Sequence, residues 1–207
     1  MRLIASDDDL TEGAAHLAAV CPVWARVLPE IGAMPLRRRQ DGFGAILDAV
    51  ISQQLSVASA NAIARKLAEA GLDQPGAILA ADDAALRACG LSAPKIRYLR
   101  GIAAAGIDWD GLRAQPDDQV IATLTALPGI GRWTAEIYLM FALGRADAFA
   151  PDDLALQEAA RIMYGLSERP KGRALAVLAE PWQPWRSVAA RGLWAYYRIA
   201  KGREGVT

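Results

Sequence analysis

The spacing of apolar residues is the feature that most constrains the fold, because it is helical along nearly the whole chain. No segment shows the sustained alternation of apolar and polar residues that marks a half-buried strand. Alanine, the best helix former, supplies 43 of the 207 residues, whereas the residues that strands favour are thinly spread. With 53% hydrophobic residues, the chain also has ample material for a core. We therefore predict an all-α protein.

Capping residues, glycines and prolines between the apolar runs set the expected helix boundaries. Asp8 or Asp9 is placed to cap the first helix, and Pro94 opens another at its first turn. Gly71 and Gly144 each stop a helix. Helices are expected over residues 10–21, 23–31, 43–51, 57–67, 84–89, 94–102, 117–127, 132–143, 153–164, 173–180 and 185–201.

The formal charges balance, with 23 basic and 23 acidic residues. This speaks against a protein that coats nucleic acid by bulk electrostatics, although it leaves room for a local basic face. Arginine outnumbers lysine by 19 to 4, and its planar fork suits phosphate oxygens. Two cysteines cannot hold a four-thiolate iron–sulfur cluster, and no run approaches the ~18 apolar residues of a membrane span. We expect a cytoplasmic protein without an iron–sulfur cluster and without a membrane partner.

The most informative segment is Leu127-Pro128-Gly129-Ile130-Gly131-Arg132-Trp133-Thr134-Ala135, where two expected helices meet across a turn with two glycines. Free N–H groups at a helix start carry partial positive charge, and glycine lets an anion approach the main chain closely. A phosphate is the natural ligand of such a turn, and this contact requires no net positive charge. The alternative is a tight corner between helices, in which the glycines serve only sterics. The spacing alone leaves both interpretations open.

Residues 127–135 resemble the helix-hairpin-helix of the DNA glycosylase superfamily that includes endonuclease III. Three further segments share this resemblance: Ile51-Ser52-Gln53-Gln54-Leu55-Ser56, Gly90-Leu91-Ser92-Ala93-Pro94-Lys95 and Pro151-Asp152-Asp153. The most similar branch is the 3-methyladenine DNA glycosylase II group, which excises alkylated bases. The resemblance extends from about Gly32 to Tyr197.

The resemblance implies two helical lobes with an active-site cleft between them. One lobe would consist of residues 1–40 and 150–207. The other would consist of residues 41–149 and carry the helix-hairpin-helix at about 117–143.

The resemblance places the catalytic aspartate of the family on Asp153. A carboxylate held beneath C1′ would stabilise the positive charge that builds on the sugar, and could orient or deprotonate the attacking water. An N-alkylated base already carries positive charge, so it leaves without a general acid. On the sequence alone, Asp152 and Asp153 would more simply cap the next helix. The surrounding motifs favour the catalytic role for Asp153 and leave Asp152 as a cap or structural partner.

Position 133 separates two mechanisms. Superfamily members that also cut the DNA strand carry a lysine there, whose amine forms a Schiff base with the sugar. The residue here is Trp133, so the resemblance implies a monofunctional enzyme without lyase activity. Its indole also offers a π face to an electron-poor base. Packing at the start of the helix is a second interpretation of Trp133, and both can hold.

The resemblance also assigns residues to base flipping. Leu55 would be the wedge that fills the stack left by the flipped nucleotide, with Gln54 beside it, and Trp194 would line the base pocket. Better-known members of the branch have an aromatic residue four positions after Trp133, where this chain has Ile137. Tyr138 follows one step later, a rotation of about 100° on a helix, so its place in the base pocket is left to the structure.

The hairpin itself would meet the DNA backbone through main-chain groups. The implied contacts are the amides of Ile130 and Gly131, together with Gly129 and Thr134. The resemblance also implies a monovalent cation, Na⁺ or K⁺, on three main-chain carbonyls, and no other cofactor is required. These carbonyls belong to Thr125, Leu127 and Ile130.

Together these features predict a monofunctional glycosylase that excises N-alkylated purines, such as 3-methyladenine and 7-methylguanine, from duplex DNA in base excision repair. One alternative is a glycosylase for another lesion, such as hypoxanthine or ethenoadenine. The other is a non-catalytic helix-hairpin-helix protein that binds damaged DNA. A kinked duplex in a cleft requires no second subunit, so we expect a monomer whose partner is double-stranded DNA with an alkylated base. It would associate with the nucleoid when bound to DNA.

Overall fold

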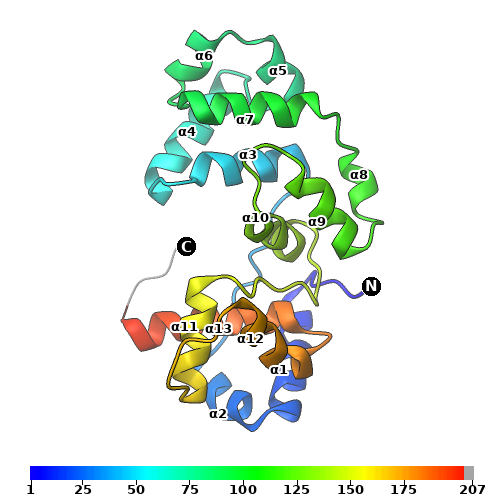
Figure 1. The fold of residues 1–207 in the computed structure, drawn as a ribbon, viewed down its shortest axis with the longest axis vertical. Coiled ribbons are helices and arrows are strands. Elements are labelled where there is room, and N and C mark those ends of the chain that lie inside the picture. Colours follow the sequence, from blue (N-terminus) through cyan, green and yellow to red (C-terminus); the bar gives the residue numbers. More distant parts are fainter. Residues whose placement is uncertain (203–207) are drawn as a thin grey trace. The chain divides into compact units, whose positions relative to one another are not determined.

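The computed structural model describes residues 1–202, which are helical and contain no strand apart from one isolated bridge, Leu3 to Arg145 (Figure 1). The predicted all-α class is confirmed. None of the helices in this range is long and apolar enough to cross a membrane. The helices are α1 (Asp7–Val20), α2 (Pro22–Ile31), α3 (Phe43–Ser52), α4 (Val57–Glu69), α5 (Pro75–Ala80), α6 (Asp83–Ala88), α7 (Ala93–Ala104), α8 (Trp109–Leu112), α9 (Asp117–Thr125), α10 (Arg132–Ile137), α11 (Leu154–Tyr164), α12 (Gly172–Leu178) and α13 (Arg186–Lys201). A π-helix, Tyr138–Ala142, follows α10, and a 3₁₀ turn, Glu180–Trp182, precedes α13.

The chain forms two compact units. Within the described residues, unit 1 contains Met1–Arg38 and residues 139–202, and unit 2 contains Arg39–Tyr138. Residues 139–149, expected in the lobe that carries the hairpin, belong to unit 1. Main-chain hydrogen bonds hold them there, because the Ile4 N–H donates to Gly144 O at 2.7 Å and the Ala146 N–H donates to Arg2 O at 3.1 Å.

Unit 1 has an aromatic core. α11 packs on α13, and α1 packs on α2. Trp24 and Trp182 are buried edge to face, with ring centroids 5.5 Å apart. Gly192 of α13 admits Trp24, since a Cβ there would lie 2.7 Å from Cζ3 of the indole. Buried aromatic pairs of this kind contribute large apolar areas to a core, which suits the long α13 at the centre of unit 1.

Unit 2 is built around α7, which packs against α3 and α5, while α9 packs against α10. Most of its core side chains are aliphatic and recur at helical spacing, as the sequence predicts. On α3 they include Ile46 and Val50, and on α7 they include Ile96 and Leu99, each at most 2% exposed.

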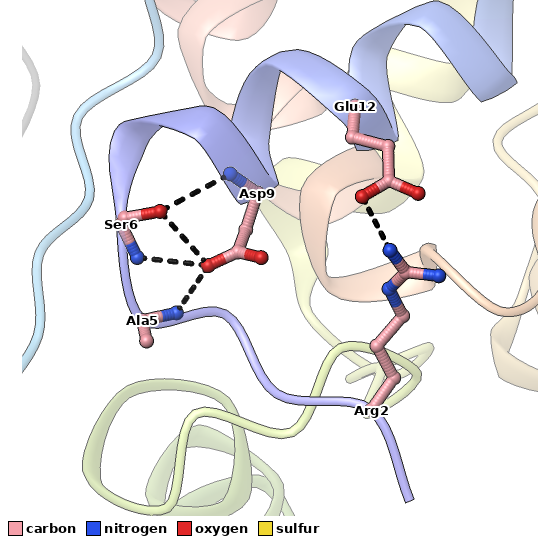
Figure 2. Close-up of polar contacts among 5 residues, drawn as sticks. All are labelled: Arg2, Ala5, Ser6, Asp9 and Glu12. Carbon is pink, nitrogen blue, oxygen red and sulfur yellow. Dashed lines mark hydrogen bonds and ion pairs between the residues drawn. The ribbon is translucent and has the colours of Figure 1, made fainter.

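The first helix corrects one expectation. Its N-cap is Ser6, and neither Asp8 nor Asp9 has that role. Figure 2 shows why: the Asp9 carboxylate accepts the N–H groups of Ala5 and Ser6, both at 2.9 Å, while the Asp9 N–H donates to the Ser6 hydroxyl. These bonds form a capping box, and the two main-chain donors lower the pKa of Asp9. One turn further on, Arg2 and Glu12 form an exposed ion pair.

Three other elements differ from expectation. The short helices α5 and α8 lie outside the expected ranges. α5 begins at Pro75, a residue that suits a first helical turn, and α8 is only 4 residues long. The helix expected over residues 132–143 instead changes to a π-helix at Tyr138. A π-turn has no distinctive local composition, and such turns often occur at functional sites.

Candidate functional site

The glycine turn lies in unit 2, between α9 and α10. After α9, the N–H of Leu127 donates to Leu124 O at 3.1 Å. Gly129 then reverses the chain with a φ of 78°, and the Ile130 N–H donates to Leu127 O at 3.3 Å. This arrangement is a compact hairpin between two helices.

α10 begins without a side-chain cap, because its N-cap residue is Gly131. Gly131 is exposed, and a Cβ built on it would meet no atom within 4 Å. The first N–H groups of a helix have no acceptor within the helix. The turn therefore combines main-chain donors with open space, which is the arrangement that an anion requires.

Gly129 serves the hairpin differently. A Cβ on Gly129 would lie 2.5 Å from Cδ2 of Tyr98, so only glycine lets that ring of α7 lie against the turn. The other two predicted backbone contacts, Ile130 and Thr134, are buried residues, 5% and 9% exposed. The Ile130 N–H already donates to Leu127 O within the turn, and the contacts of these four residues with DNA stay predictions.

The predicted cation ligands are in the same turn. The Thr125 hydroxyl donates back to Ile121 O at 2.7 Å, so it is turned toward its own helix. Leu127 O already accepts the Ile130 N–H and would have to share its second lone pair with a cation. Within residues 1–202, no group of three His, Cys, Asp or Glu side chains is placed to hold a metal ion. The cation stays a prediction.

The predicted wedge lies on the tight turn that links α3 to α4, which we call the wedge loop (residues 52–56). Gln54 adopts a φ of 58°, an uncommon conformation for a non-glycine residue, and is exposed. Leu55 follows at the tip of the loop and is 40% exposed, while its N–H donates to Ser52 O at 3.2 Å. An exposed apolar side chain on a constrained turn has the form that a wedge requires.

Two residues of unit 2, to which the sequence alone assigns no role, join the wedge loop to its neighbours. Gln53 Nε2 donates to Gly129 O at 2.9 Å, which ties the wedge loop to the hairpin. Lys95 Nζ donates to Ile51 O at 2.6 Å and to Gln53 O at 2.9 Å. Both residues belong to segments that carry the family resemblance, and only this resemblance could have indicated from the sequence that they matter to the site. Their partners are main-chain carbonyls distant in sequence, which no local pattern reveals.

Asp153 is in unit 1 and is the N-cap of α11. Its Oδ1 accepts the N–H groups of Ala155 and Leu156, both at 2.9 Å, and the indole N–H of Trp194 at 3.3 Å. The helix-cap interpretation is therefore correct as local structure. The same three bonds fix the orientation of a carboxylate that is still half-exposed, so capping and catalysis are compatible.

In unit 1, the Trp194 ring packs against Phe141, which in turn packs against Arg191. The ring centroids of Trp194 and Phe141 lie 5.8 Å apart. The guanidinium carbon of the buried Arg191 lies 4.6 Å from the centroid of the same Phe141 ring. Arg191 donates to Ser187 Oγ at 2.6 Å and to Met140 O of the π-helix at 3.4 Å. Burial lowers the pKa of Arg191 to about 10. The structure thus brings the Trp194 indole to the Asp153 carboxylate, while the place of Trp194 in a base pocket stays a prediction.

Trp133 and Tyr138 lie in unit 2 with different surroundings. Trp133 is 49% exposed at the start of α10, unusually open for a tryptophan. Tyr138 is buried, its hydroxyl accepts the Gly42 N–H at 3.0 Å, and its ring packs near Trp109. Burial raises the pKa of Tyr138. These contacts make Tyr138 part of the packing of unit 2, and its place in the base pocket stays a prediction.

The chain is similar in sequence to a known protein family. Residues 47–184 match the model of the HhH-GPD superfamily of base excision DNA repair proteins. An alkylbase DNA glycosidase-like protein of Schizosaccharomyces pombe is 28% identical over 92% of this chain and 95% of its own length. DNA-3-methyladenine glycosylase 1 of the same organism is 31% identical over 92% of this chain and 89% of its own.

Solved structures of glycosylases are also similar to this chain. The 3-methyladenine DNA glycosylase of Schizosaccharomyces pombe in complex with abasic DNA superposes with a TM-score of 0.75 at 30% identity, covering 92% of this chain and 97% of that one. A DNA-3-methyladenine glycosidase of Bacillus halodurans superposes with a TM-score of 0.81 at 30% identity, covering 97% and 95%.

Proposed function

Because the chain belongs to the HhH-GPD superfamily of base excision DNA repair proteins, we propose that it is a monofunctional glycosylase excising N-alkylated purines from duplex DNA. The observation that carries the proposal is the Asp153 carboxylate, held by two helix amides and the Trp194 indole. The similarity to 3-methyladenine glycosylases over nearly the whole chain supports the choice of alkylated bases.

In the reaction, the bond between C1′ and the base nitrogen breaks and its electron pair leaves with the base. A base that was cationic through alkylation departs neutral, so it requires no proton. The Asp153 carboxylate opposes the positive charge that develops on the sugar, and its fixed orientation means that little reorganisation is needed. Water then adds to C1′ and loses a proton to the carboxylate, which gives an abasic sugar.

The proposal predicts an intact DNA strand after excision. Schiff-base formation requires an amine at the sugar, and the residue at the start of α10 is Trp133. Its exposed indole instead suits stacking on an electron-poor base, and cation–π attraction favours the alkylated form. Intact strands with abasic sites are therefore the expected product.

DNA binding is assigned to the hairpin of unit 2. A phosphate would accept the Gly131 N–H at an exposed glycine with open space where a Cβ would stand, and the helix dipole of α10 and the π-helix that continues it would favour the anion. Carbonyls of Thr125, Leu127 and Ile130 would hold a monovalent cation beside that phosphate, supplying a further positive charge. Because the contact relies on main-chain groups, the neutral charge of the chain is compatible with double-stranded DNA as its partner. We further propose that the protein acts as a cytoplasmic monomer on the nucleoid.

Product analysis on a panel of lesions tests this function. Purified protein should release 3-methyladenine and 7-methylguanine from methylated duplex DNA and leave alkali-labile but unbroken strands. Release of hypoxanthine or ethenoadenine alone would favour a glycosylase for another lesion. Tight binding to lesion duplexes with no released base would identify a non-catalytic damage-binding protein and contradict the proposal.

A further inference from the structure

One face of α7 runs along both the wedge loop and the hairpin. Lys95, Tyr98 and Gly101 are spaced three residues apart, so they lie on the same side of the helix. Lys95 contacts the wedge loop, the Tyr98 ring lies against Gly129, and Gly101 receives Pro128 of the hairpin, since a Cβ there would lie 2.6 Å from Pro128 Cγ. A single helix face thus supports two elements that are far apart in sequence.

Lys95 binds the wedge loop by main-chain groups at the end of α3. The last carbonyls of a helix lack partners within it and carry partial negative charge, which an ammonium group can satisfy. Lys95 Nζ donates to Ile51 O at 2.6 Å, in the last turn of α3, and to Gln53 O at 2.9 Å, in the turn that follows. Both carbonyls flank the point at which the chain leaves the helix.

The loop beyond these carbonyls adopts a conformation that it would not hold unaided. Gln54 has a φ of 58°, which costs about 1 kcal/mol or more for a residue with a side chain. Leu55 comes next and is exposed, so its side chain contributes little burial to the turn. Two hydrogen bonds fix Gln53, the residue before Gln54. Its main-chain carbonyl accepts from Lys95, and its side-chain amide donates to Gly129 O.

From these contacts we propose that Lys95 is a positioning residue for base flipping. Through Ile51 O and Gln53 O it holds Leu55 ready for insertion, and through the shared face of α7 it keeps that wedge in register with the hairpin. The inference rests on the proposed function, because it gives Leu55 a task in the same reaction. In this proposal Lys95 holds the conformation of the wedge loop and does not itself contact the reacting atoms.

The test compares Lys95→Met with Lys66→Met. Methionine keeps the length of the stem and removes the ammonium group, and Lys66 is an exposed residue of α4 in the same unit. Single-turnover excision is measured on an alkylated purine paired in duplex DNA and on the same lesion opposite an abasic site. The second substrate is already partly unstacked, so it depends less on a wedge.

We expect Lys95→Met to lower the rate on the paired lesion about tenfold or more, as loss of charged hydrogen bonds does. The rate opposite an abasic site should fall by about twofold or less, and Lys66→Met should match the wild type on both. Lys95→Arg should recover most of the rate. Combining Lys95→Met with Leu55→Ala should be no worse than Leu55→Ala alone, because both remove one function.

Equal losses on the two substrates, equality of Lys95→Met with Lys66→Met, or additive effects with Leu55→Ala would each overturn the proposal. A second readout is independent of excision: 2-aminopurine placed beside an abasic analogue reports unstacking by fluorescence. At saturating protein, Lys95→Met should give a smaller rise than Lys66→Met, and an equal rise would overturn the inference. Absence of excision by the wild type would instead refute the proposed function, while the fluorescence comparison would still decide the role of Lys95.

Discussion

Two helix starts in this protein use the same main-chain chemistry in opposite ways. α10 begins at Gly131 with no side-chain cap, and there is open space where a Cβ of that residue would stand. α11 begins at Asp153, whose own carboxylate accepts the N–H groups of Ala155 and Leu156. An uncapped start can receive an anion from outside, whereas a capped start holds its own anion in place. The first arrangement suits binding a phosphate, and the second suits presenting a carboxylate to a substrate.

The largest expected effect comes from neutralising the anion at α11. Asp153→Asn should lower single-turnover excision about 10²- to 10³-fold, because a neutral amide cannot oppose charge on the sugar. Asparagine is as good an N-cap as aspartate, so the thermal midpoint should change little. Asp152→Asn is the matched control, since Asp152 is the exposed neighbour of Asp153 and should retain activity. Unchanged excision by Asp153→Asn would remove this residue from the mechanism.

The two glycines of the hairpin should separate stability from binding, and Gly129 carries the larger effect on stability. Gly129→Ala would place a methyl group 2.5 Å from Tyr98 at a φ of 78°. Strain and overpacking together should lower the free energy of unfolding by about 2–4 kcal/mol. Urea denaturation followed by circular dichroism measures this change, and a stability equal to that of the wild type would show that Tyr98 does not constrain the turn.

Gly131→Ala should lower the affinity for DNA more than it lowers stability, the opposite of Gly129→Ala. The backbone at Gly131 is extended and a methyl group there meets no atom within 4 Å, so the free energy of unfolding should fall by less than ~1 kcal/mol. The methyl group would stand where a phosphate approaches, so affinity for an abasic duplex should fall about five- to tenfold. Fluorescence anisotropy measures the affinity. Tight binding by this variant would show that the open helix start is not where the phosphate sits.

The smallest effect concerns a second carboxylate on α11. Glu158 pairs with Arg161 at 3.0 Å and with Lys201 at 3.1 Å, and these partners lower its pKa from 4.5 to about 2. A lowered carboxylate pKa stabilises the fold above pH 4.5, and that contribution is lost as the pH falls from 4.5 toward 2. The thermal midpoint of the wild type should therefore exceed that of Glu158→Gln at pH 7 and converge with it near pH 2. Excision at neutral pH should be unaffected, in contrast to Asp153→Asn.

The same two helix starts show how far the sequence could predict this site. The spacing of Gly129 and Gly131 predicts the hairpin because only glycine tolerates the φ at one position, and its absence of a side chain opens space at the other. Asp153 was interpreted either as a cap or as the catalytic carboxylate, and the structure shows the cap directly. Its role in catalysis still rests on family resemblance, because local bonds do not identify a substrate.

Features that depend on distant partners could not be predicted. The bond from Lys95 to Ile51 O and that from Gln53 to Gly129 O each end on a carbonyl, a group that every residue carries. The boundary between the units falls at Leu139, and not near 150, because Gly144 pairs with Ile4 at the other end of the chain. Ser6 displaced Asp9 as the first cap because the aspartate serves better in the reciprocal position of the capping box.

The contrast between the two helix starts is tested most directly by measuring affinity and chemistry for both variants on one substrate. Affinity for a duplex with an alkylated purine is measured by anisotropy, and the excision rate is measured in a single turnover at saturating protein. We predict that Gly131→Ala binds weakly yet excises at nearly the wild-type rate once saturated, whereas Asp153→Asn binds like the wild type and excises at least about 100-fold more slowly. If both variants lose affinity and rate together, or if Asp153→Asn fails only in binding, the division between a binding start and a catalytic start is contradicted.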